Sequence, residues 1–143
     1  MLHFAPTGHL PRVLRSVPGL QYHTADLTRA DVDHRVDIQC LPFPDRTWQY
    51  ILCSHVLDHI PDDIAALREQ RVLRPDGLLV LCVPVVESLA QTQEFGEPDM
   101  RFLNHVRDYG TDFRVRVAAF FDVTERSPDY WSGADIVRFG LRP

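Results

Sequence analysis

The chain has 143 residues with 15 basic residues, all of them arginine, and 20 acidic residues, which gives a net charge of −5. This length is enough for one domain with a hydrophobic core and too short for two, so we expect residues 1–143 to form a single domain. The acidic surplus repels a phosphate backbone and therefore disfavours a nucleic-acid partner. No apolar run approaches the roughly 20 residues that cross a bilayer, and no secretory leader is visible, so we expect a cytoplasmic protein with no membrane partner.

Three cysteines, Cys40, Cys53 and Cys82, are widely spaced, and two of them lie inside apolar runs. Their odd number and their spacing fit neither a disulfide framework nor a zinc cluster. We therefore expect buried free thiols in a reducing compartment.

The first part of the chain alternates between predicted strands and a helix. Leu2 to Ala5 is a short apolar strand candidate, and His9 to Val17 carries apolar residues with helical spacing on one face. Pro18-Gly19 ends that helix. Leu20 to Leu27 and Val36 to Ile38 are the second and third predicted strands.

The middle of the chain continues the alternation. Trp48 to Cys53 is rich in strand-forming residues, and Pro61-Asp62-Asp63 offers the start of a helix that should run to about Leu73. Pro75-Asp76-Gly77 predicts a turn before the continuous apolar strand Leu78 to Val83, which Pro84 ends.

Beyond that strand, Glu87 to Asp99 is polar and without clear periodicity, which predicts a loop long enough to form a lid over a site. The remaining predicted elements are a helix over Phe102 to Val117, a strand over Phe120 to Thr124 and a weak strand over Ile136 to Leu141. Alternating strands and helices predict an α/β fold, a doubly wound and mostly parallel sheet with helices on both faces.

Open parallel sheets bind ligands where loops leave the carboxyl ends of the strands. An acid after the second strand can accept two hydrogen bonds from a ribose diol, and an acid after the third can accept one from the exocyclic amine of adenine. Asp26 and Asp37 are the candidates for these two roles. Aspartate also closes turns by bonding its own backbone, so that alternative stays open for each of them.

Several segments resemble the class I S-adenosylmethionine-dependent methyltransferase family, in its type 11 branch. They are Leu41 to Asp45, Ser54 to His59 and Arg71 to Gly77, with Leu2 to Pro6 and His105 to Gly110 similar to one branch of these enzymes. The resemblance implies a Rossmann-like methyltransferase fold, S-adenosyl-L-methionine as cofactor and S-adenosyl-L-homocysteine as product. The cofactor-binding residues that it implies are Phe4, Ala5, Pro6, Thr7, Gly8, Asp26, Leu27, Asp37, Ile38, Cys53, Ser54 and His55.

The opening of the chain departs from the family pattern, which has a glycine-rich turn after the first strand so that backbone can approach the cofactor. Here Gly8 stands alone, Pro6 lacks an N–H group and Thr7 is β-branched, so the glycine-rich motif is degenerate.

Relative to that family the chain looks N-terminally shortened, without helices before the first strand, and Ile136 to Leu141 is a doubtful counterpart of the last antiparallel strand. A sheet that is short at this end would leave an apolar edge open to pairing. We therefore expect a second copy of the chain to cover it in a homodimer.

The resemblance implies methyl transfer to a small-molecule acceptor, a displacement that needs chiefly the alignment of nucleophile, methyl group and sulfur. Where the acceptor must lose a proton, an imidazole can act as the base. His55 is the catalytic candidate. The substrate-binding candidates are His59, His105 and Tyr109, and for His59 a structural role is the alternative.

No metal site is expected, because ligation by His55 and His59 requires one helix face and His55 belongs to a strand end. Two other functions stay open. The chain could be a non-catalytic methyltransferase-fold protein that serves as a binding or assembly module, or the scaffold could be adapted to a different reaction.

Overall fold

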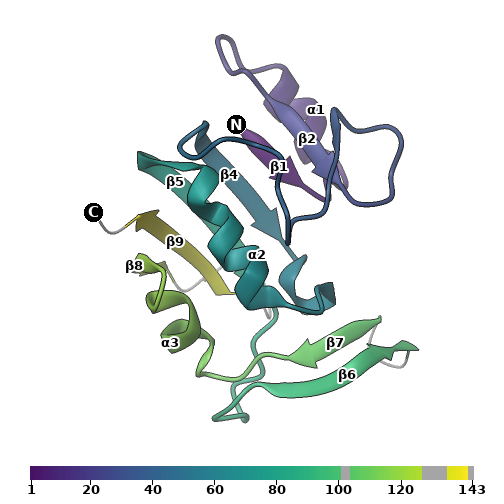
Figure 1. Ribbon diagram of the computed structural model, residues 1–143, viewed down its shortest axis with the longest axis vertical. Coiled ribbons are helices and arrows are strands. Elements are labelled where there is room, and N and C mark those ends of the chain that lie inside the picture. Colours follow the sequence, from purple (N-terminus) through teal and green to yellow (C-terminus); the bar gives the residue numbers. More distant parts are fainter. Residues whose placement is uncertain (101–103, 127–134, 142–143) are drawn as a thin grey trace.

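A computed structural model describes residues 1–100, 104–126 and 135–141 of the chain. These residues form a seven-stranded sheet with the strand order β3-β2-β1-β4-β5-β9-β8 (Figure 1). The first five strands in this order are parallel, and β9 is antiparallel to both of its neighbours. The strands are β1 (Leu2–Phe4), β2 (His23–Asp26), β3 (His34–Arg35), β4 (Trp48–Ser54), β5 (Leu73–Val83), β8 (Phe121–Arg126) and β9 (Asp135–Leu141).

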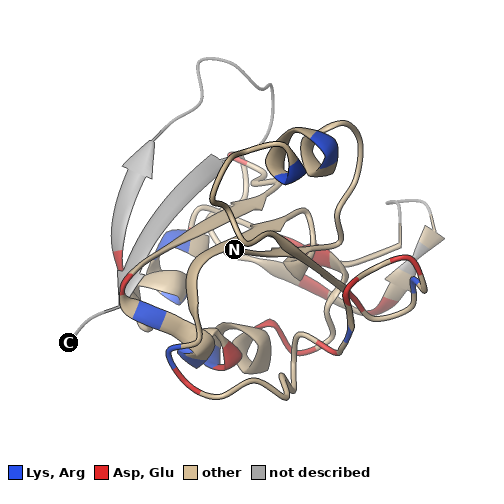
Figure 2. Ribbon diagram, turned by 90° about the horizontal axis from the view of Figure 1, so that it is seen from above, with Lys and Arg blue, Asp and Glu red and all other residues tan. Residues whose placement is uncertain are grey.

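The central strands are covered on both faces. Ile51, Leu52 and Cys53 follow one another in β4 and are all buried, which requires packing against both sides of the sheet. The helices α1 (Leu10–Arg15) and α2 (Asp63–Glu69) lie on opposite faces (Figure 2). The predicted doubly wound, mostly parallel α/β fold is therefore confirmed.

The start of α2 follows from its sequence. Asp62 is the N-cap, and its side chain accepts a hydrogen bond of 2.9 Å from the backbone N–H of Ala65. Ala66 and Leu67 are buried against the sheet. The regular helix is shorter than predicted, because the 3₁₀ turn η2 (Gln70–Val72) continues it up to β5.

The turn predicted at Pro75-Asp76-Gly77 is wrong, because these residues lie inside β5. The pairing of β4 with β5 shifts register between Trp48 and Tyr50, so the extra residues form an irregularity within the strand. A Cβ atom at Gly77 would meet the backbone oxygens of Arg74 and Gln49 at 2.8 and 2.9 Å, which explains the glycine.

The third strand also differs from the prediction over Val36 to Ile38. β3 pairs with β2 two residues earlier, with His34 opposite Ala25. Asp37 accepts a 2.8 Å hydrogen bond from the backbone N–H of Gln39, and this turn takes the chain away from the sheet edge.

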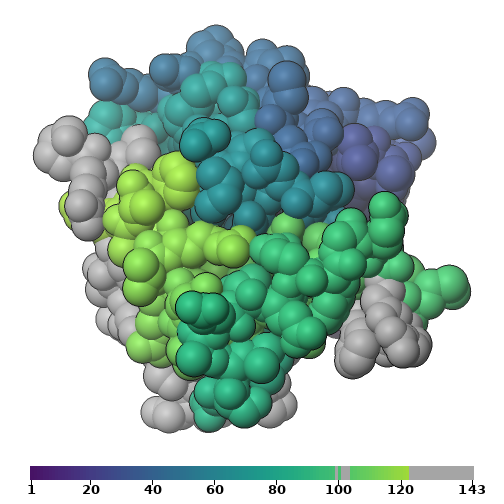
Figure 3. All heavy atoms as spheres, turned by 60° about the horizontal axis from the view of Figure 1, so that its bottom comes forward, coloured from purple at the N-terminus to yellow at the C-terminus, as the bar shows by residue number. Residues whose placement is uncertain are grey.

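The predicted lid and the helix predicted after it are only partly right. Part of the polar stretch forms strand β6 (Gln93–Asp99), which pairs antiparallel with β7 (His105–Asp108) in a separate sheet. Helix is restricted to α3 (Phe113–Ala118), and residues 101–103 lie outside the described part of the chain. The hairpin lies against η1 (Leu57–His59), and its green surface adjoins the teal surface of that region in Figure 3.

The expectation that the last antiparallel strand lacks a clear counterpart is wrong. Strand β9 pairs antiparallel with β5, with Leu81 opposite Val137, and β8 continues the sheet beyond it. The β5 edge that was expected to be open is therefore covered by the chain itself.

One hydrophobic core joins the sheet, α2 and α3. Its largest fully buried side chains include Leu2, Ile51, Leu67, Leu79, Leu81, Tyr109, Phe113 and Phe121. Cys53 and Cys82 are buried as free thiols, whereas Cys40 is exposed, contrary to the expectation. Among the described helices, none has the length and apolar character that crossing a bilayer requires.

Candidate functional site

A pocket with a volume of about 230 Å³ opens at the carboxyl ends of β1, β2 and β4. It lies where the loops leave parallel strands, the position at which open α/β sheets bind ligands. Its walls are mainly apolar and carry two carboxylates and two imidazoles. The lining residues are Phe4, Ala5, Ala25, Asp26, Leu27, Val36, Asp37, Ile38, His55, Val56, His59 and Ile60.

Asp26 stands at the end of β2 and closes a turn with the residues that follow it. Its Oδ1 accepts hydrogen bonds from the backbone N–H groups of Thr28 and Arg29, at 2.8 and 3.0 Å. Partial burial opposes ionisation, but these hydrogen bonds outweigh it and lower the pKa of Asp26. All hydrogen bonds from described residues go to Oδ1, so Oδ2 is available to a ligand.

Asp37 lies on the other side of the same pocket, in the loop after β3. Its Oδ1 accepts hydrogen bonds from the backbone and side-chain nitrogens of Gln39, at 2.8 and 3.1 Å. Leu27 and Ile38, which follow the two aspartates in sequence, line the space with them. Each of the two aspartates therefore both closes a turn and lines the pocket.

The loop after β1 contains two left-handed backbone positions, Ala5 with φ 46° and Gly8 with φ 64°. Such a conformation is strained for alanine and easy for glycine. The Arg29 guanidinium donates to the carbonyl oxygen of Pro6 and so fixes this loop to the one after β2. Ala5 lines the pocket, whereas Pro6, Thr7 and Gly8 do not.

His55 follows β4 directly and also has a positive φ, 52°. Its backbone N–H donates to the carbonyl oxygen of Cys82 at 2.9 Å, which fixes the turn, and its exposed side chain lines the pocket. His59 lies one turn further on and lines the same pocket.

Cys53 and Ser54 precede His55 but do not line the pocket. Burial raises the pKa of the Cys53 thiol, and the nearby Asp58 carboxylate adds to this effect. A thiol that stays protonated in the core is unsuited to nucleophilic chemistry.

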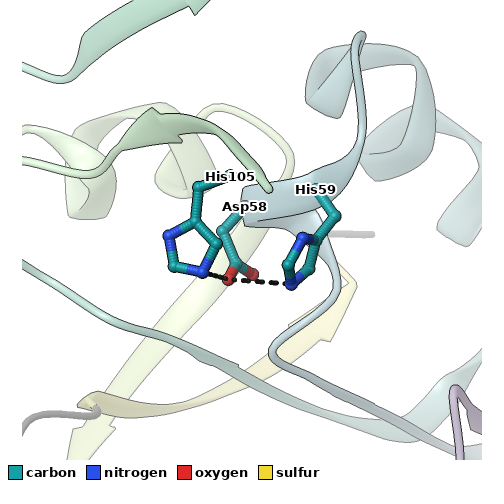
Figure 4. Close-up of side chains that lie close together, drawn as sticks. All are labelled: Asp58, His59 and His105. Atoms are coloured by element: carbon teal, nitrogen blue, oxygen red, sulfur yellow. Dashed lines mark ion pairs between the residues drawn. The ribbon is translucent and has the colours of Figure 1, made fainter. Parts of the chain in front are cut away.

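A second polar cluster borders the pocket, formed by Asp58, His59 and His105 (Figure 4). Oδ2 of Asp58 lies 3.1 Å from Nε2 of His105 and 3.6 Å from Nε2 of His59. His105 comes from β7, so the hairpin brings it to the turn that carries the other two residues. Sequence reasoning missed Asp58, although it lies in the segment that carries the family resemblance.

Tyr109 does not reach the pocket. It is 1% exposed, and its hydroxyl donates to Oδ2 of Asp63 at 2.8 Å. Burial, followed by the Asp63 charge, raises its pKa. Arg116 donates to the same carboxylate oxygen at 2.7 Å, so Tyr109 belongs to a buried network between α2 and α3.

The sequence matches the model of a known family, described as a methyltransferase domain, over residues 5–131. Among curated proteins, none matches it significantly. The structure is similar to that of the PH0226 protein from Pyrococcus horikoshii OT3, with a TM-score of 0.71 and 16% sequence identity. The similarity covers 99% of this chain and 81% of that chain.

Two further structures share the fold. One is the 1,6-didemethyltoxoflavin-N1-methyltransferase of Burkholderia thailandensis, solved with 1,6-didemethyltoxoflavin and S-adenosylhomocysteine bound. Its TM-score is 0.62 and its sequence identity is 17%, and the similarity covers 96% of this chain and 68% of that chain. The other is the [4+2]-cyclase SpnF, with a TM-score of 0.62, 20% identity, and coverage of 87% and 52%. Because the family match spans most of the sequence and the sheet has the expected strand order, this chain belongs to the methyltransferase-domain family and resembles its class I, S-adenosylmethionine-dependent members in fold.

Proposed function

We propose that the chain transfers a methyl group from S-adenosyl-L-methionine to a small-molecule acceptor. The observation that carries the proposal is that Asp26 and Asp37 line one pocket, with apolar side chains between them. This combination suits adenosine, which has a polar diol, an exocyclic amine and a flat apolar ring. The lining of the pocket therefore supports binding of the nucleoside part of the cofactor.

In this proposal Asp26 accepts hydrogen bonds from the ribose hydroxyls through Oδ2, the oxygen that its own turn leaves available. Asp37 accepts from the amine of adenine, while Leu27 and Ile38 flank the ring. When bound, the cofactor supplies a methyl group on an activated sulfonium leaving group. The protein's task is then alignment and the exclusion of water.

His55 is the proposed base. Its imidazole lines the pocket at the end of β4, and its backbone is held at a positive φ by the hydrogen bond to Cys82. A ring nitrogen of His55 would take the proton from a hydroxyl or amine acceptor as the new bond forms. The Burkholderia enzyme, whose structure contains a small-molecule ligand with S-adenosylhomocysteine, supports this class of acceptor.

Isothermal titration with S-adenosylmethionine and S-adenosylhomocysteine tests the proposal. We expect Asp26→Asn and Asp37→Asn each to weaken binding by about 1.5 to 3 kcal/mol, because a charge-assisted hydrogen bond is lost. Asp76→Asn is the matched control, since this carboxylate is exposed and remote from the pocket lining. Absence of binding by the wild-type chain at millimolar ligand would exclude the proposal.

A different reaction on the same scaffold is the second candidate, and the similarity to the cyclase SpnF favours it. The two are separated by incubating the chain with S-adenosylmethionine and panels of hydroxyl and amine acceptors. Formation of S-adenosylhomocysteine that depends on the acceptor and on His55 supports methyl transfer. Tight cofactor binding without turnover on any acceptor favours the other candidate, or the binding-module alternative.

The homodimer expected from the sequence remains a prediction, but the surface proposed for it changes. The β5 edge that motivated it is covered by β9 and β8. Among the described residues, however, Leu10, Val13 and Val17 on and beside α1 are 45%, 56% and 43% exposed. We propose this apolar face of α1 as the surface that a second copy of the chain covers.

A further inference from the structure

We propose that Asp58, His59 and His105 bind a divalent transition-metal ion of the zinc class. The three residues form the one such cluster of imidazole and carboxylate ligands among residues 1–100, 104–126 and 135–141. Two imidazoles and one carboxylate are an established ligand set for Zn²⁺ and for related first-row ions. This proposal does not depend on whether the chain transfers methyl groups.

The separations of the ligand atoms suit one shared ion. Two atoms that each lie about 2.0 to 2.2 Å from Zn²⁺ are about 3 to 3.6 Å apart at angles between 90° and 120°. Oδ2 of Asp58 lies 3.1 Å from Nε2 of His105 and 3.6 Å from Nε2 of His59. All three ligand atoms lie within 4.8 Å of one another, and the His59 side chain, which is 41% exposed, can turn to shorten the remaining separation.

The Asp58 carboxylate is buried and has an unsatisfied hydrogen-bonding capacity. Its side chain is 1% exposed, and neither carboxylate oxygen has a hydrogen-bond donor among the described residues. The imidazole nitrogens are near, but they do not meet the carboxylate with hydrogen-bond geometry. A buried carboxylate without donors is costly, and an ion held jointly with the two imidazoles removes that cost.

His59 has the orientation of a metal ligand. Its Nδ1 lies 3.3 Å from the carbonyl oxygen of Asn104, to which it can only donate. In the neutral ring this leaves the lone pair on Nε2, which faces Asp58 in Figure 4. A backbone carbonyl that accepts from the second nitrogen is the usual support of a metal-bound histidine.

The two halves of the site are held together by a buried arginine. Arg107 of β7 donates to the carbonyl oxygens of Leu57 and Ile60, both at 2.6 Å, and of Pro61 at 2.8 Å. These bonds join the strand of His105 to the turn of Asp58 and His59 before any ion binds, as a preorganised site requires. Three protein ligands leave a coordination position open, and His59 also lines the pocket described above.

Equilibrium dialysis and calorimetry with Zn²⁺, and visible d–d spectra with Co²⁺, test the proposal on the metal-free chain of residues 1–143. We expect one ion per chain, with affinity reduced at least tenfold in His105→Gln and in His59→Gln. The control is His34→Gln, because His34 and His23 stack with ring centroids 5.2 Å apart and form the other histidine pair that could attract a metal. This control should leave stoichiometry and affinity unchanged.

Asp58→Asn separates a metal site from a purely structural cluster. In the absence of metal we expect this variant to melt at the same temperature as the wild type or higher, because it removes a buried charge. Added Zn²⁺ should raise the melting temperature of the wild type and not that of the variant. The proposal is overturned if the wild type binds no Zn²⁺, or if binding survives in Asp58→Asn and is lost in His34→Gln.

Discussion

His3 is a buried histidine that the proposed reaction does not use. It is 3% exposed, and its Nδ1 lies 2.7 Å from the Tyr22 hydroxyl. Burial lowers its pKa from 6.5 to about 4. Between these values the unfolded chain binds more protons than the folded chain, so stability should fall as the pH drops through this window, by on the order of 2 kcal/mol. Urea denaturation at several pH values measures this slope.

His3→Asn removes the titrating ring and keeps an acceptor near the position of Nδ1, so it should flatten the pH dependence below pH 6.5. The control is His9→Asn, since His9 is exposed. An unchanged slope in His3→Asn would assign the pH dependence to other groups.

At the level of single residues, what could be predicted depended on the neighbours along the chain. That Asp26 and Asp37 line one pocket could be predicted because each lies near the end of a predicted strand, and strand ends meet at one edge of a parallel sheet. Asp58 was missed because its significance comes from His105, 47 positions further on and in a hairpin that was not predicted. Tyr109 was predicted to contact the substrate. Its burial and its hydrogen bond to Asp63 depend on long-range packing, which no local sequence pattern reveals.

Arg107, which is 2% exposed, is one of the residues that attach the β6–β7 hairpin to the rest of the molecule. Besides the three carbonyl oxygens of the turn at residues 57–61, its Nε donates to Glu94 at 2.8 Å. Arg107→Met should cost about 3 kcal/mol of stability, because buried carbonyl oxygens lose their donor. Hydrogen exchange should then show faster opening of the β6 and β7 amides than of the β4 amides.

The exposed Arg12 on α1 provides the matched substitution, and Arg12→Met should leave both stability and exchange unchanged. Equal acceleration across β4 and β7 in Arg107→Met would mean that the hairpin and the large sheet open as one unit, contrary to the expected local effect.

Elements with a strong apolar pattern were predicted well, and polar ones were not. Strand β4, the apolar second half of β5 and the capped helix α2 follow from local sequence. β6 contains the polar sequence Gln-Glu-Phe-Gly-Glu-Pro-Asp, which by itself predicts a loop, and it gains its strand structure from pairing with β7. β7 buries Arg107, which donates to three backbone carbonyl oxygens and to the Glu94 carboxylate. Such long-range hydrogen bonds to a buried charge are visible only in the folded molecule.

For the whole molecule, the parallel order of the sheet could be predicted because right-handed crossovers leave few arrangements for alternating strands and helices. The place of β9 in the sheet could not be predicted from local sequence. It lies between β5 and β8 although it follows both in sequence, and a long-range insertion of this kind has no local signal. The sequence also placed Leu10 and Val13 on one face of a helix, but it does not say what covers that face.

The exposed face of α1 predicts self-association of the whole molecule. Large apolar side chains gathered on one helix mark an interaction surface, and a helix this short predicts a small interface and a weak dimer. Val13→Asp would place a charge in the centre of that interface, since Val13 is 56% exposed between Leu10 and Val17. Sedimentation velocity should therefore show a concentration-dependent dimer for the wild type and a monomer for the variant.

Val115→Asp is the matched control, because Val115 is 74% exposed on α3 and lies outside the α1 face. It should change the charge by the same amount and leave the dimer intact. If Val115→Asp dissociates the dimer and Val13→Asp does not, the interface lies on the α2–α3 side of the sheet. A wild-type chain that sediments as a monomer throughout the micromolar range rules out the dimer. The apolar face of α1 would then be exposed to solvent in a stable monomer.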